Sequence, residues 1–399
     1  MSLIGQRVTV LGAGVAGLAV ARALALRGAV VTVLEQADAV REVGAGLQVS
    51  PNGAAVLKAL GLGPALEAAS QRAVAVELRD GLEGGLVTRL EVGRLRPGQG
   101  YHFVHRADLI GLLLDGAREA GVELRLLSRV EAVDLSGEVP ALVMEDGTRE
   151  EAALLIGADG LHSQTRAALN GRVAPFFTGQ VAWRALIPGD GAGAVAEVHM
   201  GPGRHVVSYP LRGGTLRNIV AVEERRQWAE EGWSLRDDPM EMRLAFKGFS
   251  PRVRGWLDQV EDVYLWGLFR HPVAQVWGRA LPSVTGSGGA VAILGDAAHP
   301  TLPFLAQGAA MGLEDAWVLA EQLAACDTFG AGIAAYQRLR QDRVHRIVAA
   351  ASRNARASHL GGMARTLAHA GLRLGGWVAP EMALKRFDWL YGHDVTRGA

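Results

Sequence analysis

A short segment near the start of the chain limits what the whole chain can fold into. A strand over Arg7–Leu11 runs directly into a Gly-x-Gly-x-x-Gly turn and an Ala/Leu-rich helix. A second strand over Val30–Leu34 then ends at the acidic residue Glu35. Strand, glycine turn, helix, strand and acid in this order predict a dinucleotide-binding βαβ unit. The glycines of the turn are Gly12, Gly14 and Gly17.

Each residue of this unit has a chemical reason to be there. Gly12 permits the tight turn, Gly14 lets a pyrophosphate approach the backbone, and Gly17 lets the helix pack against the strand. The helix N-terminus supplies free N–H groups and about half a positive charge for the phosphates. Glu35 can accept hydrogen bonds from ribose hydroxyls. The pattern alone does not distinguish FAD from NAD.

Two later motifs also follow predicted strands. A helix is expected over residues 106–120, and a strand over residues 153–156 leads into Asp159. A strand over residues 290–294 leads into Asp296 and then into an Ala-rich helix that begins near Gln307.

With these motifs in this order, the chain resembles the single-component FAD-dependent aromatic hydroxylases, the group A flavoprotein monooxygenases. The similarity is greatest to the salicylate hydroxylase and 6-hydroxynicotinate 3-monooxygenase branch, and it covers nearly the whole chain. The resemblance rests on the glycine turn with Glu35, residues 44–52 (GAGLQVSPN), Arg106, Asp159-Gly160, residues 181–184 (VAWR), Gly295-Asp296 and residues 336–340 (YQRLR).

The resemblance implies non-covalent FAD and assigns residues to it. Asp296 matches the acceptor for the ribityl hydroxyls, Arg106 the arginine near the FAD phosphate, and Arg41 a contact to the adenosine half. The helix that begins at Gln307 and Gly308 is expected to aim its N-terminal amides at the flavin N1–C2=O edge. Its dipole should stabilise negative charge on the reduced flavin.

Asp159 belongs to a motif that the family associates with FAD and with reduced nicotinamide. Its position in a turn favours hydrogen bonds to its own loop, so a structural role is expected rather than a catalytic one. His299, which precedes a proline, is interpreted as a residue that anchors its loop.

The sequence predicts an α/β fold: a Rossmann-type FAD-binding domain with an inserted antiparallel β-sheet substrate domain and a C-terminal helical segment. Strands over residues 180–187, 205–209, 216–222 and 262–269, separated by Gly/Pro turns, predict the inserted sheet. The expected limits are residues 1–75, 102–174 and 270–335 for the FAD-binding domain, 76–101 and 175–269 for the substrate domain, and 336–399 for the helices.

Three residues are predicted to act on the substrate. His205 and Tyr209 are four residues apart on one predicted strand, so both side chains lie on the same sheet face. Relatives use a His and a Tyr at this spacing to bind the substrate and assist its deprotonation, a role that suits an imidazole with a pKa near neutrality. A satisfied histidine on a half-buried strand remains an open alternative. Pro303, in the loop before the flavin-facing helix, is expected to form one wall of the pocket.

Composition excludes several other functions. The chain has 49% hydrophobic residues, and its 41 Lys and Arg cancel its 41 Asp and Glu, so neither disorder nor nucleic-acid binding is expected. One cysteine and the absence of a membrane-length apolar run favour the cytoplasm. His102 and His105 lack partners at ligand spacing, so they are interpreted as loop histidines and no metal site is predicted. Six arginines between Arg338 and Arg356 are interpreted as a solvated helix face.

The expected activity is that of a monooxygenase. The resemblance implies that NADH or NADPH reduces FAD, that O₂ forms a C4a-hydroperoxyflavin, and that one oxygen atom passes to a small phenolic or pyridine carboxylate-like substrate. A flavin-dependent reductase or dehydrogenase on the same scaffold, without oxygen transfer, is the alternative. Monomer and homodimer are both open.

Overall fold

A six-stranded sheet forms around the predicted βαβ unit in this computed structural model, which describes residues 2–40, 45–225, 235–283, 288–357, 359–378 and 385–397. Neighbouring strands are parallel, except for β19 and β20 at one edge. The strands predicted over Arg7–Leu11 and Val30–Leu34 are confirmed with the same bounds as β1 and β2. Across the sheet the order is β19 (Gly278–Ala280), β20 (Ala290–Ile293), β12 (Leu154–Gly157), β1, β2 and β8 (Glu123–Arg125).

Three helices pack together beside this sheet, with α1 (Val15–Ala25) in contact with both α4 (Arg106–Glu119) and α8 (Gly308–Ala325). The predicted helix over residues 106–120 is therefore confirmed to within one residue. Parallel strands bring their carboxyl ends to one edge of the sheet. The motif residues that follow β1, β2, β12 and β20 consequently gather at that edge.

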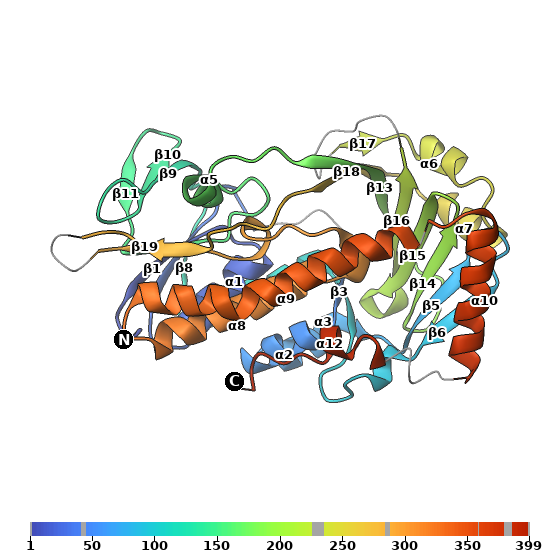
Figure 1. The fold of residues 1–399 in the computed structure, drawn as a ribbon, viewed down its shortest axis with the longest axis horizontal. Helices are drawn as coiled ribbons and strands as arrows, with labels where there is room; N and C mark the ends of the chain where they lie inside the picture. The colour runs from blue at the N-terminus through green and yellow to red at the C-terminus, as the bar shows by residue number, and fades with distance from the viewer. Residues whose placement is uncertain are drawn as a thin grey trace.

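An eight-stranded sheet forms the opposite end of the molecule (Figure 1). The predicted antiparallel pairing is confirmed except at one place, where β5 and β14 pair in parallel. Parallel neighbours need a long crossover connection, and here the chain forms two strands of the six-stranded sheet, β12 and β8, between β5 and β14. In order, the strands are β17 (Arg236–Asp237), β18 (Val263–Arg270), β13 (Phe176–Pro188), β16 (Leu216–Glu224), β15 (Arg204–Leu211), β14 (Val195–Gly201), β5 (Ala75–Asp80) and β6 (Leu86–Leu90).

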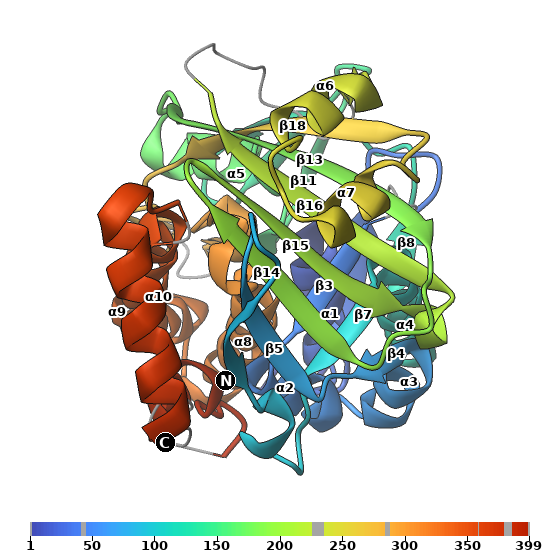
Figure 2. The ribbon, with the colours of Figure 1, turned by 90° about the vertical axis from the view of Figure 1, so that its right-hand side faces the viewer.

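The two faces of this sheet have different neighbours. Short helices α6 (Pro239–Ala245) and α7 (Pro251–Leu257) cover one face, where Trp183 packs into a separate apolar core (Figure 2). Ala182 and Val222 on the opposite face pack with Leu302, which belongs to the connection between β20 and α8. The connection from β20 of the six-stranded sheet to α8 therefore packs against this second face.

Smaller elements fill the space around the sheets. One three-stranded sheet orders β3 (Gly46–Val49), β7 (His102–His105) and β4 (Ser70–Arg72), and another orders β11 (Arg149–Glu151), β10 (Ala141–Met144) and β9 (Val130–Asp134). The interpretation of His102 and His105 as loop histidines is wrong, because both are buried at the ends of β7. The remaining elements here are α2 (Pro51–Ala59), α3 (Gly63–Ala69), α5 (Gln164–Asn170) and the 3₁₀ turns η1 (Val92–Arg94), η2 (Arg212–Gly214), η3 (Gly295–Ala297) and η4 (Pro303–Leu305).

Helices end the described chain. Helix α9 (Phe329–Ala357) packs on α8 and extends along the molecule towards the eight-stranded sheet, and α10 (Gly362–Val378) contacts β6 at the edge of that sheet (Figure 1). A short helix, α12 (Asp388–Tyr391), contacts α2. Within the described residues, no helix has the length and apolar character needed to cross a membrane.

Candidate active site

The glycine turn after β1 has the geometry that its sequence predicts. Gly12 has a φ of +102°, and a Cβ on it would lie 2.5 Å from the carbonyl oxygen of Ala158. A Cβ on Gly17 would lie 1.9 Å from the carbonyl oxygen of Gly12, so α1 can pack here only without a side chain. Gly14 differs, because nothing lies within 4 Å of its Cβ position. The backbone at the N-terminus of α1 is therefore open to a ligand, and its first amides have no partner within the helix.

Glu35, at the end of β2, braces this turn. One carboxylate oxygen accepts a hydrogen bond from the backbone N–H of Ala13 at 2.9 Å, and the other accepts from the N–H of Ala37 at 3.0 Å. A carboxylate oxygen can accept more than one bond, so both remain able to accept from a ribose. The bracing role was missed by sequence reasoning, and the ribose contact stays a prediction.

Asp296 is exposed to solvent although every other residue from 289 to 300 is buried. Enough protein surrounds its carboxyl that desolvation raises the pKa of Asp296, while the nearby positive charges of His299, Arg106 and His271 oppose that rise. Arg106 begins α4, and its backbone N–H donates to the carbonyl of Ala45 at 2.8 Å. The two residues that the resemblance assigns to FAD are thus close enough to interact electrostatically.

Asp159 bonds to its own loop, as expected from its turn position. Its carboxylate accepts from the Ser163 hydroxyl at 2.5 Å and from both the backbone N–H and the hydroxyl of Thr165 at 3.1 Å. Burial raises the pKa of Asp159, and these hydrogen bonds work in the opposite direction. The geometry therefore favours a structural role for this carboxylate over a direct cofactor contact.

Gln307 is the N-cap residue of α8, and its side chain is committed within the protein. Its amide nitrogen donates to the Ser50 hydroxyl at 2.9 Å, and its amide oxygen accepts from the Asn52 side chain at 3.1 Å. Any flavin contact from Gln307 must therefore come from its backbone. Ala306 before it has a φ of +54°, a left-handed conformation that reverses the chain just before the helix starts at Gly308.

A buried ion network fixes α8 in place. His299 and Arg340 both contact the Asp315 carboxylate, which also accepts from the Gly295 N–H at 3.1 Å. Burial would raise the pKa of Asp315, but its positive neighbours dominate and lower it to about 2. The expectation that His299 anchors its loop is confirmed by this contact.

The interpretation of the arginines near the end of the chain as a solvated face is wrong for two of them. Arg340 is 1% exposed and contacts Glu314, and Arg343 donates to the same carboxylate at 2.8 and 2.9 Å. The apolar pattern of α9 did not indicate these partners, because Glu314 lies on another helix.

His205 and Tyr209 lie together on the sheet face that meets the β20–α8 connection. Both belong to β15, and their cross-strand neighbours on β16 are Val222 and Asn218. These neighbours are also four residues apart, so side-chain alternation puts both pairs on one face of the sheet. Tyr209 is 4% exposed, and its ring lies 5.1 Å from that of Phe103. A Cβ on Gly46 would approach the Tyr209 ring to 2.6 Å, so this loop glycine makes room for the tyrosine.

The protonation states of this pair follow from their burial. Burial, and then the adjacent His359, lower the pKa of His205 to about 3, so the expected near-neutral pKa is wrong for the substrate-free protein. Burial raises the pKa of Tyr209 far above neutrality despite the nearby charge of Arg184. The imidazole is therefore neutral and the phenol is a hydrogen-bond donor at physiological pH.

Pro303 begins η4 and is exposed, whereas the next residue faces the sheet. The ring centroid of Phe304 lies 5.7 Å from that of His205, and Phe304 packs with Leu302 against the same apolar cluster. Sequence reasoning missed Phe304 and His359. A loop aromatic next to a predicted pocket residue was the one available signal for Phe304, and nothing local pointed to His359. A wall role for Pro303 stays a prediction.

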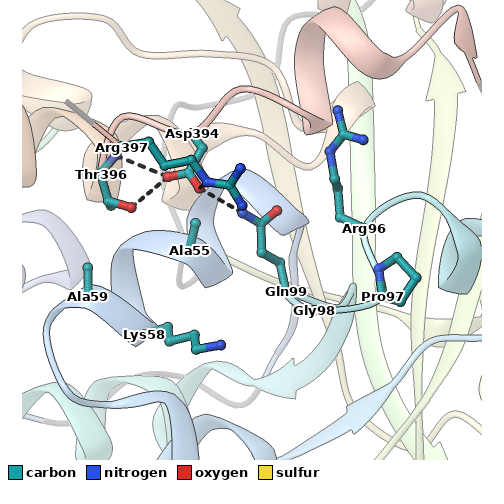
Figure 3. Close-up of a pocket in the computed structure, with 10 residues that line it drawn as sticks. All are labelled: Ala55, Lys58, Ala59, Arg96, Pro97, Gly98, Gln99, Asp394, Thr396 and Arg397. Carbon is teal, nitrogen blue, oxygen red and sulfur yellow. Dashed lines mark hydrogen bonds and ion pairs between the residues drawn. The ribbon is translucent and has the colours of Figure 1, made fainter. Parts of the chain in front are cut away.

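A separate surface hollow of about 360 Å³ lies away from these residues (Figure 3). Residues of α2, of the loop before β7 and of the last described segment line it, and Gln99 donates to Asp394 across it at 2.9 Å. None of the predicted site residues borders this hollow. Within the described parts of the chain, no group of three or more His, Cys, Asp or Glu side chains is placed to hold a metal ion.

The edge residues of the six-stranded sheet fit FAD. An open backbone at Gly14, an acid after β2, the exposed Asp296 after β20 and the N-terminus of α8 all lie at its carboxyl-end edge, where ligands bind in such sheets. Arg41 lies outside the described residues, so its predicted adenosine contact has no structural counterpart here.

Comparisons with known proteins agree with this geometry. The FAD binding domain family matches residues 6–225 and 283–351. A 3-amino-4-hydroxybenzoate 2-monooxygenase, PtnB3, of Streptomyces platensis is 35% identical over 98% of this chain and 96% of its own. The 3-hydroxybenzoate 6-hydroxylase of Polaromonas naphthalenivorans (strain CJ2) is 36% identical over 97% and 96% of the two chains. The 6-hydroxynicotinate 3-monooxygenase of Bordetella bronchiseptica (strain ATCC BAA-588 / NCTC 13252 / RB50) is 31% identical over 98% and 95%.

Solved structures match over the same extent. Klebsiella pneumoniae HpxO, crystallised with FAD and uric acid, gives a TM-score of 0.81 at 25% identity, covering 96% of this chain and 95% of that one. A salicylate hydroxylase substrate complex gives 0.79 at 25% identity, covering 98% and 96%. The chain therefore belongs to the FAD binding domain family, and within it to the FAD-dependent monooxygenases of the group A aromatic hydroxylases.

Proposed function

We propose that this enzyme uses NADH or NADPH and O₂ to hydroxylate a small phenolic or pyridine carboxylate on the sheet face that carries His205 and Tyr209. The observation that carries the proposal is the meeting of that face with the loop running from Asp296 to α8. Phe304 of this loop approaches His205. One loop therefore links the edge of the six-stranded sheet, where FAD would bind, to the face of the eight-stranded sheet where the substrate would bind. Relatives with hydroxybenzoate and hydroxynicotinate names support the substrate class.

The residues that would hold FAD follow from the edge of the six-stranded sheet. The amides near Gly14 and the Arg106 side chain would bind the phosphates, Glu35 the ribose, and Asp296 the ribityl hydroxyls. The N-terminus of α8 at Gly308 would lie against the flavin ring. When bound, FAD would supply the redox chemistry, in which two electrons from the nicotinamide reduce O₂, one oxygen atom enters the substrate ring and the other leaves as water.

The substrate side supplies binding and proton handling. Tyr209, which stays protonated, would donate a hydrogen bond to the substrate, while the neutral His205 would accept its phenolic proton. Removing that proton raises the electron density of the ring, which favours attack on an electrophilic oxygen, and a positioned base contributes roughly 10²–10⁴-fold. Leu302 and Leu268 are buried beside this face and would keep water from the reacting atoms.

A cation on the same face favours an anionic substrate. Arg184 lies on β13, stacks over the Trp266 ring at 4.1 Å and donates to the carbonyl of Gly46 at 2.9 Å. Its charge reaches Tyr209, since it works against the rise in the Tyr209 pKa. A carboxylate on the substrate would therefore be attracted to this part of the face.

The organisation predicted from the sequence is part of the proposal. The FAD-binding domain comprises residues 1–75, 102–174 and 270–335, and the substrate domain residues 76–101 and 175–269. The C-terminal helical unit takes residues 336–399. A cytoplasmic location fits an enzyme that consumes NAD(P)H.

A substrate screen tests the function. Purified protein loaded with FAD is mixed with NADH or NADPH and a panel of hydroxybenzoates, aminohydroxybenzoates and hydroxynicotinates, and nicotinamide oxidation is followed with ¹⁸O₂ present. The expected result is stimulated oxidation together with a product that carries one ¹⁸O atom. Stimulated oxidation without ¹⁸O in any product would indicate the alternative, a flavin reductase on the same scaffold.

A further inference from the structure

Three side chains from different parts of the chain form a continuous hydrogen-bonded line. His205 Nδ1 lies 2.6 Å from His359 Nε2, and His359 Nδ1 lies 2.8 Å from Glu224 Oε1. His205 comes from β15 and Glu224 from the end of β16. His359 follows α9, and its backbone carbonyl accepts from the N–H of Gly203 in the β14–β15 turn at 3.1 Å. The C-terminal segment is thus pinned where its imidazole meets the substrate face.

Burial changes steeply along this line. His205 is 3% exposed and the His359 side chain 2%, whereas the Glu224 side chain is 54% exposed. The line therefore begins beside the proposed substrate position and ends in solvent. Within the described part of the chain, Glu224 is the charged side chain in contact with His359. Apart from His205 and Glu224, the polar side chain near the His359 ring is that of Gln180, whose amide nitrogen lies 3.3 Å from His359 Nδ1.

The hydrogen positions along the line follow from its outer end. An ionised carboxylate only accepts, so His359 Nδ1 carries the hydrogen and donates to Glu224. Nε2 of a neutral His359 then holds a lone pair, and His205 Nδ1 must donate to it. This leaves Nε2 of His205 as the acceptor, the state needed to receive a substrate proton. The Gln180 amide at the longer distance cannot donate to the same protonated nitrogen.

We propose that His205, His359 and Glu224 form a proton relay that carries the hydroxyl proton of the substrate from the sheet face to solvent. The substrate O–H bond breaks as His205 Nε2 takes the proton, His205 Nδ1–H passes its hydrogen to His359 Nε2, and His359 Nδ1–H passes its hydrogen to Glu224, which releases it to water. Both imidazoles end neutral with reversed tautomers. Reprotonation of the product oxyanion along the same line restores them.

A relay explains how the buried His205 can accept a proton without holding a positive charge. An imidazole buried next to a second imidazole holds a positive charge poorly, which is the cause of its low pKa. It can nevertheless accept a proton if it gives up its other one at the same time. Glu224 supplies the final acceptor, and its exposure lets water complete the transfer. The relay rests on the proposed function, because it needs a substrate with an ionisable hydroxyl.

Proton release tests the relay without turnover. Oxidised, FAD-loaded enzyme without NAD(P)H is mixed in a stopped-flow instrument with a hydroxybenzoate that stimulates NAD(P)H oxidation in the screen above. A pH-indicator dye reports protons released, and the absorbance of the bound phenolate reports deprotonation. In His359→Gln and Glu224→Gln we expect both signals to slow at least tenfold, while FAD content and substrate affinity stay near those of the parent enzyme.

A matched histidine separates a relay from a structural effect. His369 is also buried on the C-terminal segment, where it lies 3.3 Å from Asp80, but it has no part in the line. His369→Gln should release protons at the parent rate. Added imidazole should restore release in His359→Gly, which a purely structural role would not allow.

The outcomes distinguish the relay from the function on which it rests. If no aromatic compound stimulates oxidation by the parent enzyme, the proposed function fails. If the parent enzyme is stimulated and His359→Gln releases protons at the parent rate, the relay is overturned while the function stands. Should His359→Gln fail to fold, the exposed Glu224→Gln decides the question, with unchanged release as the contrary result.

Discussion

The ring of Phe304 lies 5.7 Å from the ring of His205, although one belongs to the loop before α8 and the other to the eight-stranded sheet. This contact joins the cofactor side of the protein to the substrate side. It also places an aromatic ring next to the imidazole that we propose to accept the substrate proton.

Phe304→Ala is therefore expected to loosen substrate placement without loss of FAD. Next to His205, the Phe304 ring would also contact the aromatic ring of the substrate. Losing a contact of about 1.4 kcal/mol with the substrate corresponds to roughly a tenfold rise in KM, and a looser site should also lower the yield of product per NAD(P)H oxidised. Steady-state kinetics with product quantification measures both. Phe176→Ala is the control, because Phe176 is 69% exposed. Equal coupling in the two variants would argue against a pocket position for Phe304.

Gly14 and Gly17 offer a matched pair of substitutions in one turn. Gly17→Ala forces a Cβ against the Gly12 carbonyl and should destabilise the protein itself by about 1–3 kcal/mol. Gly14→Ala meets no neighbour, so the stability of the FAD-free protein should change by no more than about 0.5 kcal/mol while FAD affinity falls. Urea unfolding and FAD titration separate the two effects. Native FAD affinity in Gly14→Ala would show that the FAD phosphates do not bind at this turn.

Asp296→Ala tests the other end of the cofactor. The exposed carboxylate would accept ribityl hydroxyls, and each charged hydrogen bond contributes about 1.5–3 kcal/mol. The variant should lose FAD on gel filtration or bind it at least tenfold more weakly, with its fold intact by circular dichroism. Full occupancy by FAD is the result that this assignment does not allow.

Arg340→Met should destabilise the protein strongly. Glu314 and Asp315 are buried, and their positive neighbours lower both pKa values to about 2. Removing one partner of a buried ion pair costs about 3–5 kcal/mol, because it leaves uncompensated charge behind. Arg338→Met, on the exposed side of the same helix, should stay near the parent value in urea unfolding. Similar losses in both variants would contradict the network.

Acid should destabilise the folded protein through its buried histidines. An unfolded chain protonates His205 near pH 6.5, whereas the folded chain does so at about pH 3. Between these values the unfolded state binds more protons, so the free energy of unfolding decreases as the pH falls from about 6.5 towards 3. His205→Gln should show a shallower decrease when urea unfolding is compared at several pH values. Identical pH dependence would mean that His205 does not stay neutral in the folded state.

The parts of the fold that sequence predicted well are those that local pattern controls. The observed bounds of β1 and β2 are the same as the predicted ones. Each strand is a short apolar run with a glycine close to one of its ends, so the signals that define it lie within a few residues of each other. The motifs also gather as predicted, since parallel strands place their carboxyl ends together. His205 and Tyr209 share a strand face for the same reason of simple alternation.

The missed features depend on residues far apart in the chain. His359 contacts His205 across 154 positions, and Arg340 contacts Asp315 on a neighbouring helix, so no local periodicity reports either contact. The parallel pairing of β5 with β14 likewise depends on how the chain returns after a long excursion. The near-neutral pKa expected for His205 failed because burial, not residue type, sets that value.

The length of helix α9 is constrained independently of the side chains at its exposed positions. Arg343 near its middle is fixed by Glu314, and the segment just beyond its end is fixed by His359 at the sheet. An α-helix advances 1.5 Å and turns about 100° per residue, so inserting or deleting one residue between Arg343 and Ala357 would rotate and shift everything beyond it. We therefore expect the number of residues between Arg343 and Ala357 to be fixed, whereas the residue types at exposed positions of this stretch can vary.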